Sequence, residues 1–338
     1  MKLHYKIFIF ILISSFILSA CSRGLANDDA SGKYEFKLSH TSASNHHYQT
    51  ISEEFAKLVH ERTDGNVKID IFPSDQLGSQ NIAVEGVLIG TQDIVLTSDT
   101  LLSSWIPDVG ILNLPFLFED SDHVRRVLDG EIGDLLSSKV EEEGALVLAW
   151  WENGFRSITN SKNEIKEPAD LKGMKIRTPE GEVFIDTFKT LGALPTPISF
   201  GELYSALQLG TVDAQENPPA HIITQRYYEV QDFVSRTNHI HISTPILINK
   251  KAFERMPEEY QIIVKDTAIE LAAVHTDMIE DLESEQWELI EENGMKILDV
   301  DREPFLEATK SVYEKYEKIF DPALIKEIQM ESKSKRGE

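Results

Sequence analysis

The sequence predicts an α/β fold of two lobes that close like a clamshell, with one long helix spanning both lobes. Strands and helices alternate along the chain in two successive units, which meet near residue 153. A stretch typical of a strand at 239–250 is placed to carry the chain back to the first unit. Residues 257–293 indicate a helix longer than one small domain is wide. Two α/β units joined in this way bind ligands where the carboxyl ends of their strands face a cleft.

The first unit begins with a strand whose polar and apolar residues alternate. Its expected strands are 34–39, 67–71, 93–97 and a strand from Ala145. Its expected helices are 48–62, 79–90 and roughly 121–142. This order predicts a parallel sheet with right-handed crossovers.

The second unit repeats the pattern. Its expected strands lie around 155–159, at 174–177 and at 211–215. Its expected helices are 181–191, 200–209 opened by Ser199, and one that starts after Pro218-Pro219. We therefore expect lobe I to comprise 33–153 and 243–282, and lobe II to comprise 154–242 and 283–330.

The long helix is predicted from Pro257 to Asn293, where the chain has no glycine or internal proline and Gly294 occupies the C-cap position. About 37 residues at ~1.5 Å each give roughly 55 Å. Two helices separated by an unmarked kink are the alternative. A last helix is expected at 303–319.

The N-terminus carries the features of an export signal. Lys2 and Lys6 precede an apolar run too short to span a bilayer, and the run ends just before Cys21, the only cysteine in the chain. This resembles a bacterial lipobox, which predicts a signal peptide at 1–20, lipid on Cys21, a tether at 21–32 and an extracytoplasmic, membrane-anchored protein. An ordinary signal peptide is the alternative.

The net charge is −24, and about −26 once the two lysines of the signal are removed. Such an acidic chain is a poor partner for nucleic acid or for anionic lipid. A small anionic ligand is not excluded, because the groups around a buried site decide its binding. No later apolar stretch is long enough to cross a membrane.

Motifs for catalysis, cofactors and metals are missing from the sequence. It has no GxSxG, GxxxxGK[ST], HExxH or GxGxxG pattern. His46 and His47 would point to opposite faces of a strand, and His239 and His241 have no acidic or cysteine partner nearby in the sequence. We expect no metal and no cofactor.

Three polar side chains fall at predicted strand ends facing the cleft. Arg156 follows an Asn-Gly turn, Arg177 ends a strand, and Asn217 precedes Pro218, which holds the backbone extended. A guanidinium holds a carboxylate through two parallel hydrogen bonds, a geometry that lysine cannot match. Taken singly, each arginine also fits a surface salt bridge, Asn217 fits turn chemistry, and Phe200 fits a core position.

Longer motifs surround these residues: NGFR, LKGMKIRTP, SFGELYSALQ and VDAQENPP, preceded by FPSDQLG, GTQDIVLTS and LPFLF. Together they resemble the substrate-binding subunits of tripartite ATP-independent periplasmic (TRAP) transporters over nearly the whole mature chain. The resemblance implies the periplasmic-binding-protein fold, a carboxylated solute bound between two lobes, no chemical conversion of it, and membrane transporter subunits as partners.

By this resemblance Arg177 is the bidentate carboxylate anchor, Arg156 adds a second charge-assisted contact, Asn217 binds the same end of the ligand, and Phe200 packs on its carbons. The loops of the first lobe that supply the remaining polar contacts contain four further candidates: His40, His47, Gln80 and Ser98.

The WENGFR, KIRTP and AQENP motifs look closer to binders of sugar acids such as glucuronate or galacturonate than to binders of four-carbon dicarboxylates. A dicarboxylate, or another keto or hydroxy acid, is the alternative ligand. A sensory lipoprotein of the same fold and a hydrolase using Glu152 and Glu216 are the alternative functions.

Overall fold

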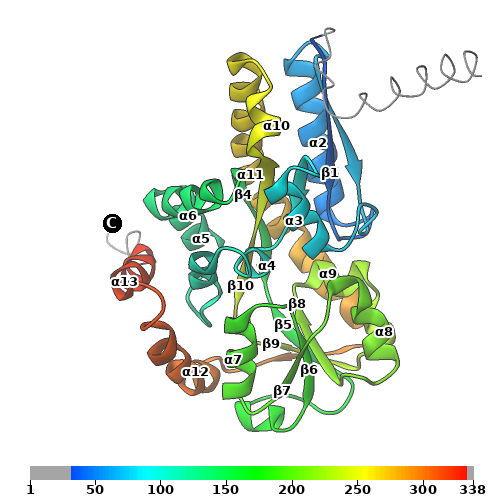
Figure 1. The fold of residues 1–338 in the computed structure, drawn as a ribbon. Coiled ribbons are helices and arrows are strands. Elements are labelled where there is room, and N and C mark those ends of the chain that lie inside the picture. The colour runs from blue at the N-terminus through cyan, green and yellow to red at the C-terminus, as the bar shows by residue number, and fades with distance from the viewer. Residues whose placement is uncertain (1–31, 333–338) are drawn as a thin grey trace, which may run out of the picture. The chain divides into compact units, whose positions relative to one another are not determined.

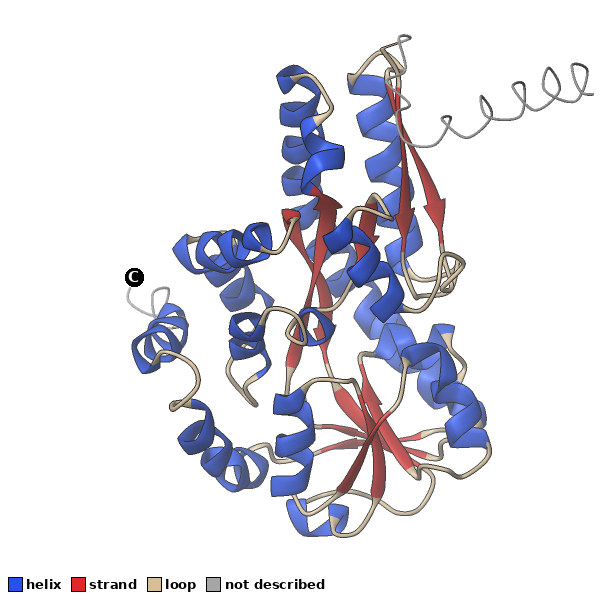
Figure 2. Cartoon of the chain, in the orientation of Figure 1, coloured by secondary structure: helices blue, strands red, loops and turns tan. Residues whose placement is uncertain are grey.

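A computed structural model describes residues 32–332. The predicted signal peptide, Cys21 and the tether up to residue 31 lie outside the described residues. Of the described residues, 35–332 belong to one compact unit, to which the following description applies. Among the residues that are described, no helix is long and apolar enough to cross a membrane. The unit contains two β-sheets surrounded by helices (Figure 1, Figure 2).

The first sheet has the strand order β2-β1-β3-β10-β4. Its strands are β1 (Tyr34–Ser39), β2 (Val67–Phe72), β3 (Ile94–Leu96), β4 (Ala145–Phe155) and β10 (His241–Asn249). β1 and β3 are parallel, as predicted, but β10 runs antiparallel to both β3 and β4. The expectation of a purely parallel sheet is therefore wrong, because the returning strand enters between two strands of the first unit.

The helices around this sheet begin and end at residues suited to those positions. They are α2 (His47–Arg62), α3 (Gln80–Ile89), α4 (Asp99–Leu102), a 3-10 helix η1 (Pro107–Asn113), α5 (Ser121–Leu128) and α6 (Glu131–Glu142). The predicted single helix at 121–142 is two helices, because Asp129 and Gly130 interrupt it. Gly90 ends α3 in the left-handed conformation that glycine adopts without strain.

The second sheet has the order β11-β9-β5-β8-β6-β7. Its strands are β5 (Ser157–Asn160), β6 (Lys175–Thr178), β7 (Leu194–Pro197), β8 (Ala214–Asn217), β9 (Phe233–Arg236) and β11 (Lys296–Asp299). β6 is parallel to β7 and β8, whereas β5 is antiparallel to β8 and β9. This sheet is therefore also mixed, and β7, β9 and β11 were not predicted.

Helical segments pack on both faces of the second sheet. They are η2 (Pro168–Leu171), α7 (Glu182–Thr190), η3 (Phe200–Glu202), α8 (Leu203–Gln208), α9 (Pro219–Thr224) and η4 (Tyr227–Glu229). One core lies around Phe184 and Phe188 of α7, and another around Leu203 and Tyr227. Burial of these side chains fixes where the ends of β6 and β8 lie.

One unbroken helix, α11 (Glu258–Glu292), follows the short α10 (Lys250–Glu254). α11 contacts β4 and α2 beside the first sheet, and α9 and β11 beside the second. Figure 1 shows it in yellow to orange passing from one sheet toward the other. The prediction of one helix spanning both lobes is confirmed, and the alternative of two helices is wrong.

The C-terminal helices are α12 (Glu303–Tyr316) and α13 (Pro322–Glu331), so the predicted helix at 303–319 ends earlier and a further helix follows. α12 packs on α7, whereas α13 packs on α5. Phe320, Ile325 and Ile328 thus join the core of the first-sheet side. The proposed lobe boundaries remain a prediction, and α13 would be the exception within 283–330.

The chain also crosses between the sheets at two strand connections. β4 ends at Phe155 and β5 begins at Ser157, and a second connection runs from β9 to β10. Backbone hydrogen bonds join the two crossings: Arg156 N donates to Ile240 O at 3.0 Å, and His239 N donates to Arg156 O at 3.3 Å. Arg156 therefore occupies the joint between the two parts of the fold.

Candidate functional site

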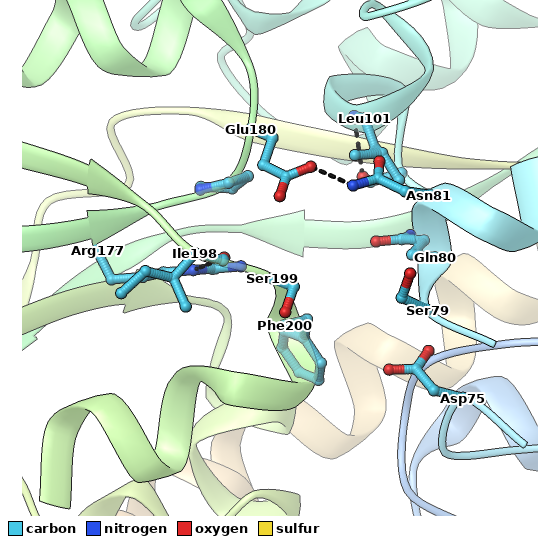
Figure 3. Close-up of a pocket in the computed structure, with 12 residues that line it drawn as sticks. Asp75, Ser79, Gln80, Asn81, Leu101, Arg177, Glu180, Ile198, Ser199 and Phe200 are labelled. Carbon is cyan, nitrogen blue, oxygen red and sulfur yellow. Dashed lines mark hydrogen bonds between the residues drawn. The ribbon is translucent and has the colours of Figure 1, made fainter. Parts of the chain in front are cut away.

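A cavity of about 30 Å³ lies between the two parts of the fold (Figure 3). From the first-sheet side it is lined by Asp75, Ser79, Gln80, Asn81, Ser98 and Leu101. From the second-sheet side it is lined by Arg177, Pro179, Glu180, Ile198, Ser199 and Phe200. Four of the predicted binding residues, namely Arg177, Phe200, Gln80 and Ser98, therefore meet at one cavity.

Arg177 enters the cavity from β6. Its side chain is 3% exposed, and Nε donates a hydrogen bond to Ile198 O at 2.8 Å. Neither terminal nitrogen of the guanidinium has an acceptor within hydrogen-bond distance among the described residues. Burial lowers the pKa of Arg177 to about 10, so the cation is held at a cost in desolvation. An oxyanion reaching both terminal nitrogens would offset that cost.

Arg156 is equally buried but is already engaged by the protein. Nε lies 2.5 Å from Glu216 Oε2, and Nη2 donates to Glu216 Oε1 and Asn217 Oδ1, each at 2.9 Å. Nη2 also donates to the backbone oxygen of Glu216. Arg156 is not among the residues lining the cavity. It braces the end of β8 and leaves at most Nη1 for a ligand.

Glu216 is the carboxylate that Arg156 neutralises. Burial alone would raise the pKa of Glu216, but Arg156 and the nearby imidazole of His239 outweigh burial and lower it. Next to it, Asn217 donates from Nδ2 to Gln215 Oε1, and Gln215 donates to Thr159 Oγ1 at 2.8 Å. Asn217 is 1% exposed. These bonds fix the position of Asn217 beside Arg156.

The other predicted cavity residues have simpler surroundings. Phe200 begins η3, and its ring lies 4.9 Å from the ring of His221. Gln80 is the first residue of α3. Ser98 caps α4 by accepting a hydrogen bond from Leu101 N at 3.2 Å. Its hydroxyl proton remains available to a ligand in the cavity.

His40 and His47 do not line this cavity. His40 is bonded through Nε2 to Gln49 Oε1 at 3.0 Å. His47 is the first residue of α2, and its Nδ1 lies 2.6 Å from His275 Nε2. The prediction that His46 and His47 point apart on a strand is wrong, because a helix begins there and their rings lie 3.9 Å apart.

The predicted pair His239 and His241 serves two different carboxylates. His239 Nε2 lies 3.4 Å from Glu216 Oε2, and His241 Nε2 lies 3.3 Å from Glu152 Oε1. Glu152 also accepts from Ser121 Oγ at 2.7 Å. Glu152 and Glu216 are thus held in separate buried networks. Within residues 32–332, no group of three metal-ligating side chains is arranged to hold a metal ion.

Several contacts close the cavity at its rim. Asn81 of α3 donates to Glu180 beyond β6, which Figure 3 shows as a dashed line. Ser104 Oγ donates to Glu180 O at 3.3 Å. A Cβ atom at Gly181 would lie 2.5 Å from Thr100 Cγ2, so the two sides approach closely only because residue 181 is glycine.

The sequence does not indicate His221, Asn81 or Glu180 as site residues, and it offers Glu216 only as a catalytic carboxylate. Glu216 and His221 flank the predicted Asn217, so their neighbourhood in the sequence was a signal for both. Asn81 and Glu180 lie 99 residues apart, and no local pattern connects them.

Residues 38–319 match the model of a family described as bacterial extracellular solute-binding protein, family 7. The chain is 36% identical over 258 residues to the 2,3-diketo-L-gulonate-binding periplasmic protein YiaO of Escherichia coli K12. That match covers 76% of this chain and 79% of YiaO.

Two solved TRAP periplasmic solute-binding proteins have similar folds. One, from Polaromonas sp. JS666 and bound to D-erythronate, has a TM-score of 0.85 and 36% identity, covering 88% of this chain and 98% of that one. The other, from Roseobacter denitrificans with bound β-D-glucuronate, has a TM-score of 0.83 and 31% identity, covering 87% and 99%.

Proposed function

The chain belongs to family 7 of the bacterial extracellular solute-binding proteins, and on that premise we propose that it binds a carboxylated sugar, a hexuronate such as glucuronate or galacturonate. Members of this family are binding proteins of transport systems and not enzymes. The ligand, the residues that hold it and the membrane anchor are the proposed parts.

The observation that carries the proposal is that Arg177 is buried with unmet hydrogen-bond donors. It is a buried cation at a cavity between the two sheets, and within residues 32–332 both its terminal nitrogens lack an acceptor. A carboxylate accepts two parallel hydrogen bonds from this arrangement. Arg156, through Nη1, and Asn217 would support the same carboxylate. Phe200 would pack against the carbon skeleton.

Hydroxyl recognition favours a sugar acid over a simple acid. Gln80 and Ser98 bring polar groups to the first-sheet side of the cavity, opposite Arg177. His40 and His47 do not line the cavity, so they would contact a ligand only in an open or enlarged site. The similar proteins named above bind 2,3-diketo-L-gulonate, D-erythronate and β-D-glucuronate, which are all oxygen-rich acids. A four-carbon dicarboxylate or another organic acid is the alternative.

Binding is proposed to be coupled to movement of the lobes. The cavity of about 30 Å³ is far smaller than the roughly 300 Å³ at the lower end for ligand pockets. A sugar acid can enter it only if the two sides move apart and then close on the ligand. The closed, loaded form would then deliver the ligand to the TRAP membrane subunits. Signalling to a membrane receptor, in a sensory lipoprotein, would use the same closure.

A thermal-shift screen across carboxylic acids tests the ligand class. Any acid that binds the folded state raises the melting temperature, increasingly with its concentration above Kd. Hexuronates should give the largest shifts, and calorimetry should confirm one bound acid per chain. A panel in which only dicarboxylates shift the melting temperature would support the alternative ligand.

Anchoring through lipid on Cys21 is a separate proposal, based on the sequence before this residue. Acylation would hold the chain at the membrane. Cys21→Ser should move the protein from the membrane fraction to the released fraction. Retention of the variant in the membrane fraction would contradict the anchor without affecting the ligand proposal.

A further inference from the structure

Three histidines from distant parts of the chain stack beside the cavity; we call His46, His47 and His221 the imidazole cluster. The rings of His46 and His221 are stacked at 4.3 Å with 13° between their planes. The ring of His47 lies 3.9 Å from that of His46. All three are at most 5% exposed. The cluster joins the start of α2, on the first-sheet side, to α9, on the second-sheet side.

The hydrogen bonds of His46 and His221 determine which of their nitrogens carries the proton. His46 Nδ1 accepts from Tyr48 N at 3.2 Å, so its proton is on Nε2. His221 Nε2 lies 3.1 Å from Asn153 Nδ2, an amide nitrogen that donates, so the proton of His221 is on Nδ1. Both imidazoles are neutral, because burial lowers the pKa of each well below its usual value.

The protonated nitrogen of His47 is determined in the same way, through its neighbour His275. Glu152 N donates to His275 Nδ1 at 3.5 Å, which places the proton of His275 on Nε2. His275 Nε2 then donates to His47 Nδ1 at 2.6 Å, and the proton of His47 is on Nε2. Burial also lowers the pKa of His47 well below its usual value.

Each member of the cluster is left with one buried N–H group that has no acceptor among the described residues: His46 Nε2, His47 Nε2 and His221 Nδ1. A buried donor without an acceptor is destabilising, because it has lost its hydrogen bond to water and gained none in exchange. The lone pair of each ring is already used by a donor, so none is available to a metal ion. What these three groups need is oxygen acceptors.

The cluster adjoins the proposed carboxylate site. The ring of His221 lies 4.9 Å from that of Phe200, which lines the cavity with Arg177. The proposed function supplies a carboxylate at Arg177, and the remainder of a sugar acid is rich in hydroxyl oxygens. The protein thus presents cationic donors to one end of such a ligand and neutral donors beside it.

We propose that the imidazole cluster is the subsite for the hydroxyl and carbonyl oxygens of the ligand, which selects oxygen-rich acids over acids with apolar skeletons. This inference rests on the proposed function. Because His46 belongs to the first-sheet side of the fold and His221 to the second-sheet side, a ligand oxygen that accepts hydrogen bonds from both also holds the lobes together.

The test uses two variants that remove a free N–H and one that restores it; His221→Phe also removes the acceptor of Asn153 Nδ2, a loss that both test acids share. His46→Asn keeps an oxygen to cap α2, His46→Gln keeps a distal amide N–H, and His221→Phe keeps the ring stack. His60→Phe, an exposed histidine on α2, is the control. Calorimetry compares D-glucuronate with cyclohexanecarboxylate, which has the same ring size and carboxylate but no hydroxyl groups.

His46→Asn and His221→Phe should each weaken D-glucuronate binding about tenfold, a loss expected for one buried hydrogen bond, and should leave cyclohexanecarboxylate within twofold. His46→Gln should recover much of the loss. Equal losses for both acids, or no loss for D-glucuronate, would overturn the subsite while leaving the proposed function intact. If the wild type binds no carboxylic acid, the proposed function fails and the subsite fails with it.

Discussion

Arg156 and Arg177 are both 3% exposed, yet they differ in their hydrogen-bond partners and in their place in the fold. Arg156 has acceptors at Nε and Nη2, supplied by Glu216 and Asn217. Arg177 has one acceptor, Ile198 O, at Nε. Arg156 lies at the joint between the sheets, whereas Arg177 lies at the cavity.

The difference shows that burial alone does not identify a binding arginine. A buried guanidinium whose donors are satisfied by the protein contributes to the fold, because removing it leaves a carboxylate uncompensated. A buried guanidinium with unmet donors contributes to binding, because a ligand satisfies them. Substitutions at groups of each kind should therefore differ in whether they change stability or ligand binding.

Arg156→Leu should lower the free energy of unfolding by about 3–5 kcal/mol, because Glu216 is left buried without its cation. Denaturant unfolding measures this loss. Arg62→Leu is the control: its ion pair with Glu270 is exposed to solvent, so its loss should change stability far less. Replacing Arg156 and Glu216 together by leucine should recover much of the loss. Equal stability of Arg156→Leu and Arg62→Leu would show that the buried ion pair of Arg156 does not stabilise the fold.

Arg177→Lys should weaken ligand binding by about 2–5 kcal/mol, because lysine cannot make the paired hydrogen bonds to a carboxylate. Its stability without ligand should stay within about 1 kcal/mol of the wild type, since lysine keeps the charge and no carboxylate among the described residues forms an ion pair with Arg177. Calorimetry and denaturant unfolding on the same preparation measure both quantities. Unchanged affinity would exclude Arg177 from the site.

Lowering the pH should reduce stability through two groups that titrate in different ranges, Glu216 and His275. The pKa of Glu216 is lowered below 4.5, so its contribution to stability is present above that pH and is lost as the pH falls through the lowered value. Burial lowers the pKa of His275, which is bonded to His47, from 6.5 to about 4. The stability that His275 contributes is therefore present above pH 6.5 and is lost as the pH falls toward 4.

His275→Gln should accordingly flatten the dependence of stability on pH by about 1.4 kcal/mol per pH unit in this window. Unfolding free energies at pH 6.5, 5.5 and 4.5 check the slope. Burial raises the pKa of Asp99 to about 6, which acts in the opposite direction, but it does so in both proteins and cancels in the comparison. Parallel slopes would contradict the expected role of His275.

The smallest effect is expected at the rim of the cavity. Asn81→Ala removes the hydrogen bond to Glu180 and should weaken ligand binding by about 0.5–1 kcal/mol, mainly through faster dissociation. Stopped-flow fluorescence measures the rate. Asn163→Ala, whose amide bonds only Glu164 O in an exposed loop, should leave the rate unchanged. A slower dissociation from Asn81→Ala would show that the contact opposes closure.

The local parts of the fold were predictable from the sequence. The alternating residues of β1 and β2 and the glycine-free and proline-free run of α11 each carry their own signal. β7 gave none, because LPTP contains two prolines, which a strand tolerates at the edge of a sheet, where β7 lies. The antiparallel placement of β10 depends on its neighbours and not on its own residues.

For the site, the sequence predicted which residues lie together better than how each one is bonded. Arg177, Phe200, Gln80 and Ser98 were expected at one cavity, and they line it. The bracing of Arg156 by Glu216 was missed, because motif and strand-end arguments do not show which donors a side chain has already used. The stacking of His46 on His221 joins residues 175 positions apart and becomes visible only in the fold.

The continuity of α11 restricts how the molecule can move. A helix of 35 residues without proline or glycine offers no point at which to fold, so it acts as a stiff rod alongside both sheets. Bending between the two sheets is therefore left to the strand connections, which run from β4 to β5 and from β9 to β10. The adjoining pairing of β4 with β10 already shifts register at Ile242/Ser243 and at Ile246/Leu247, irregularities at which paired strands bend most easily.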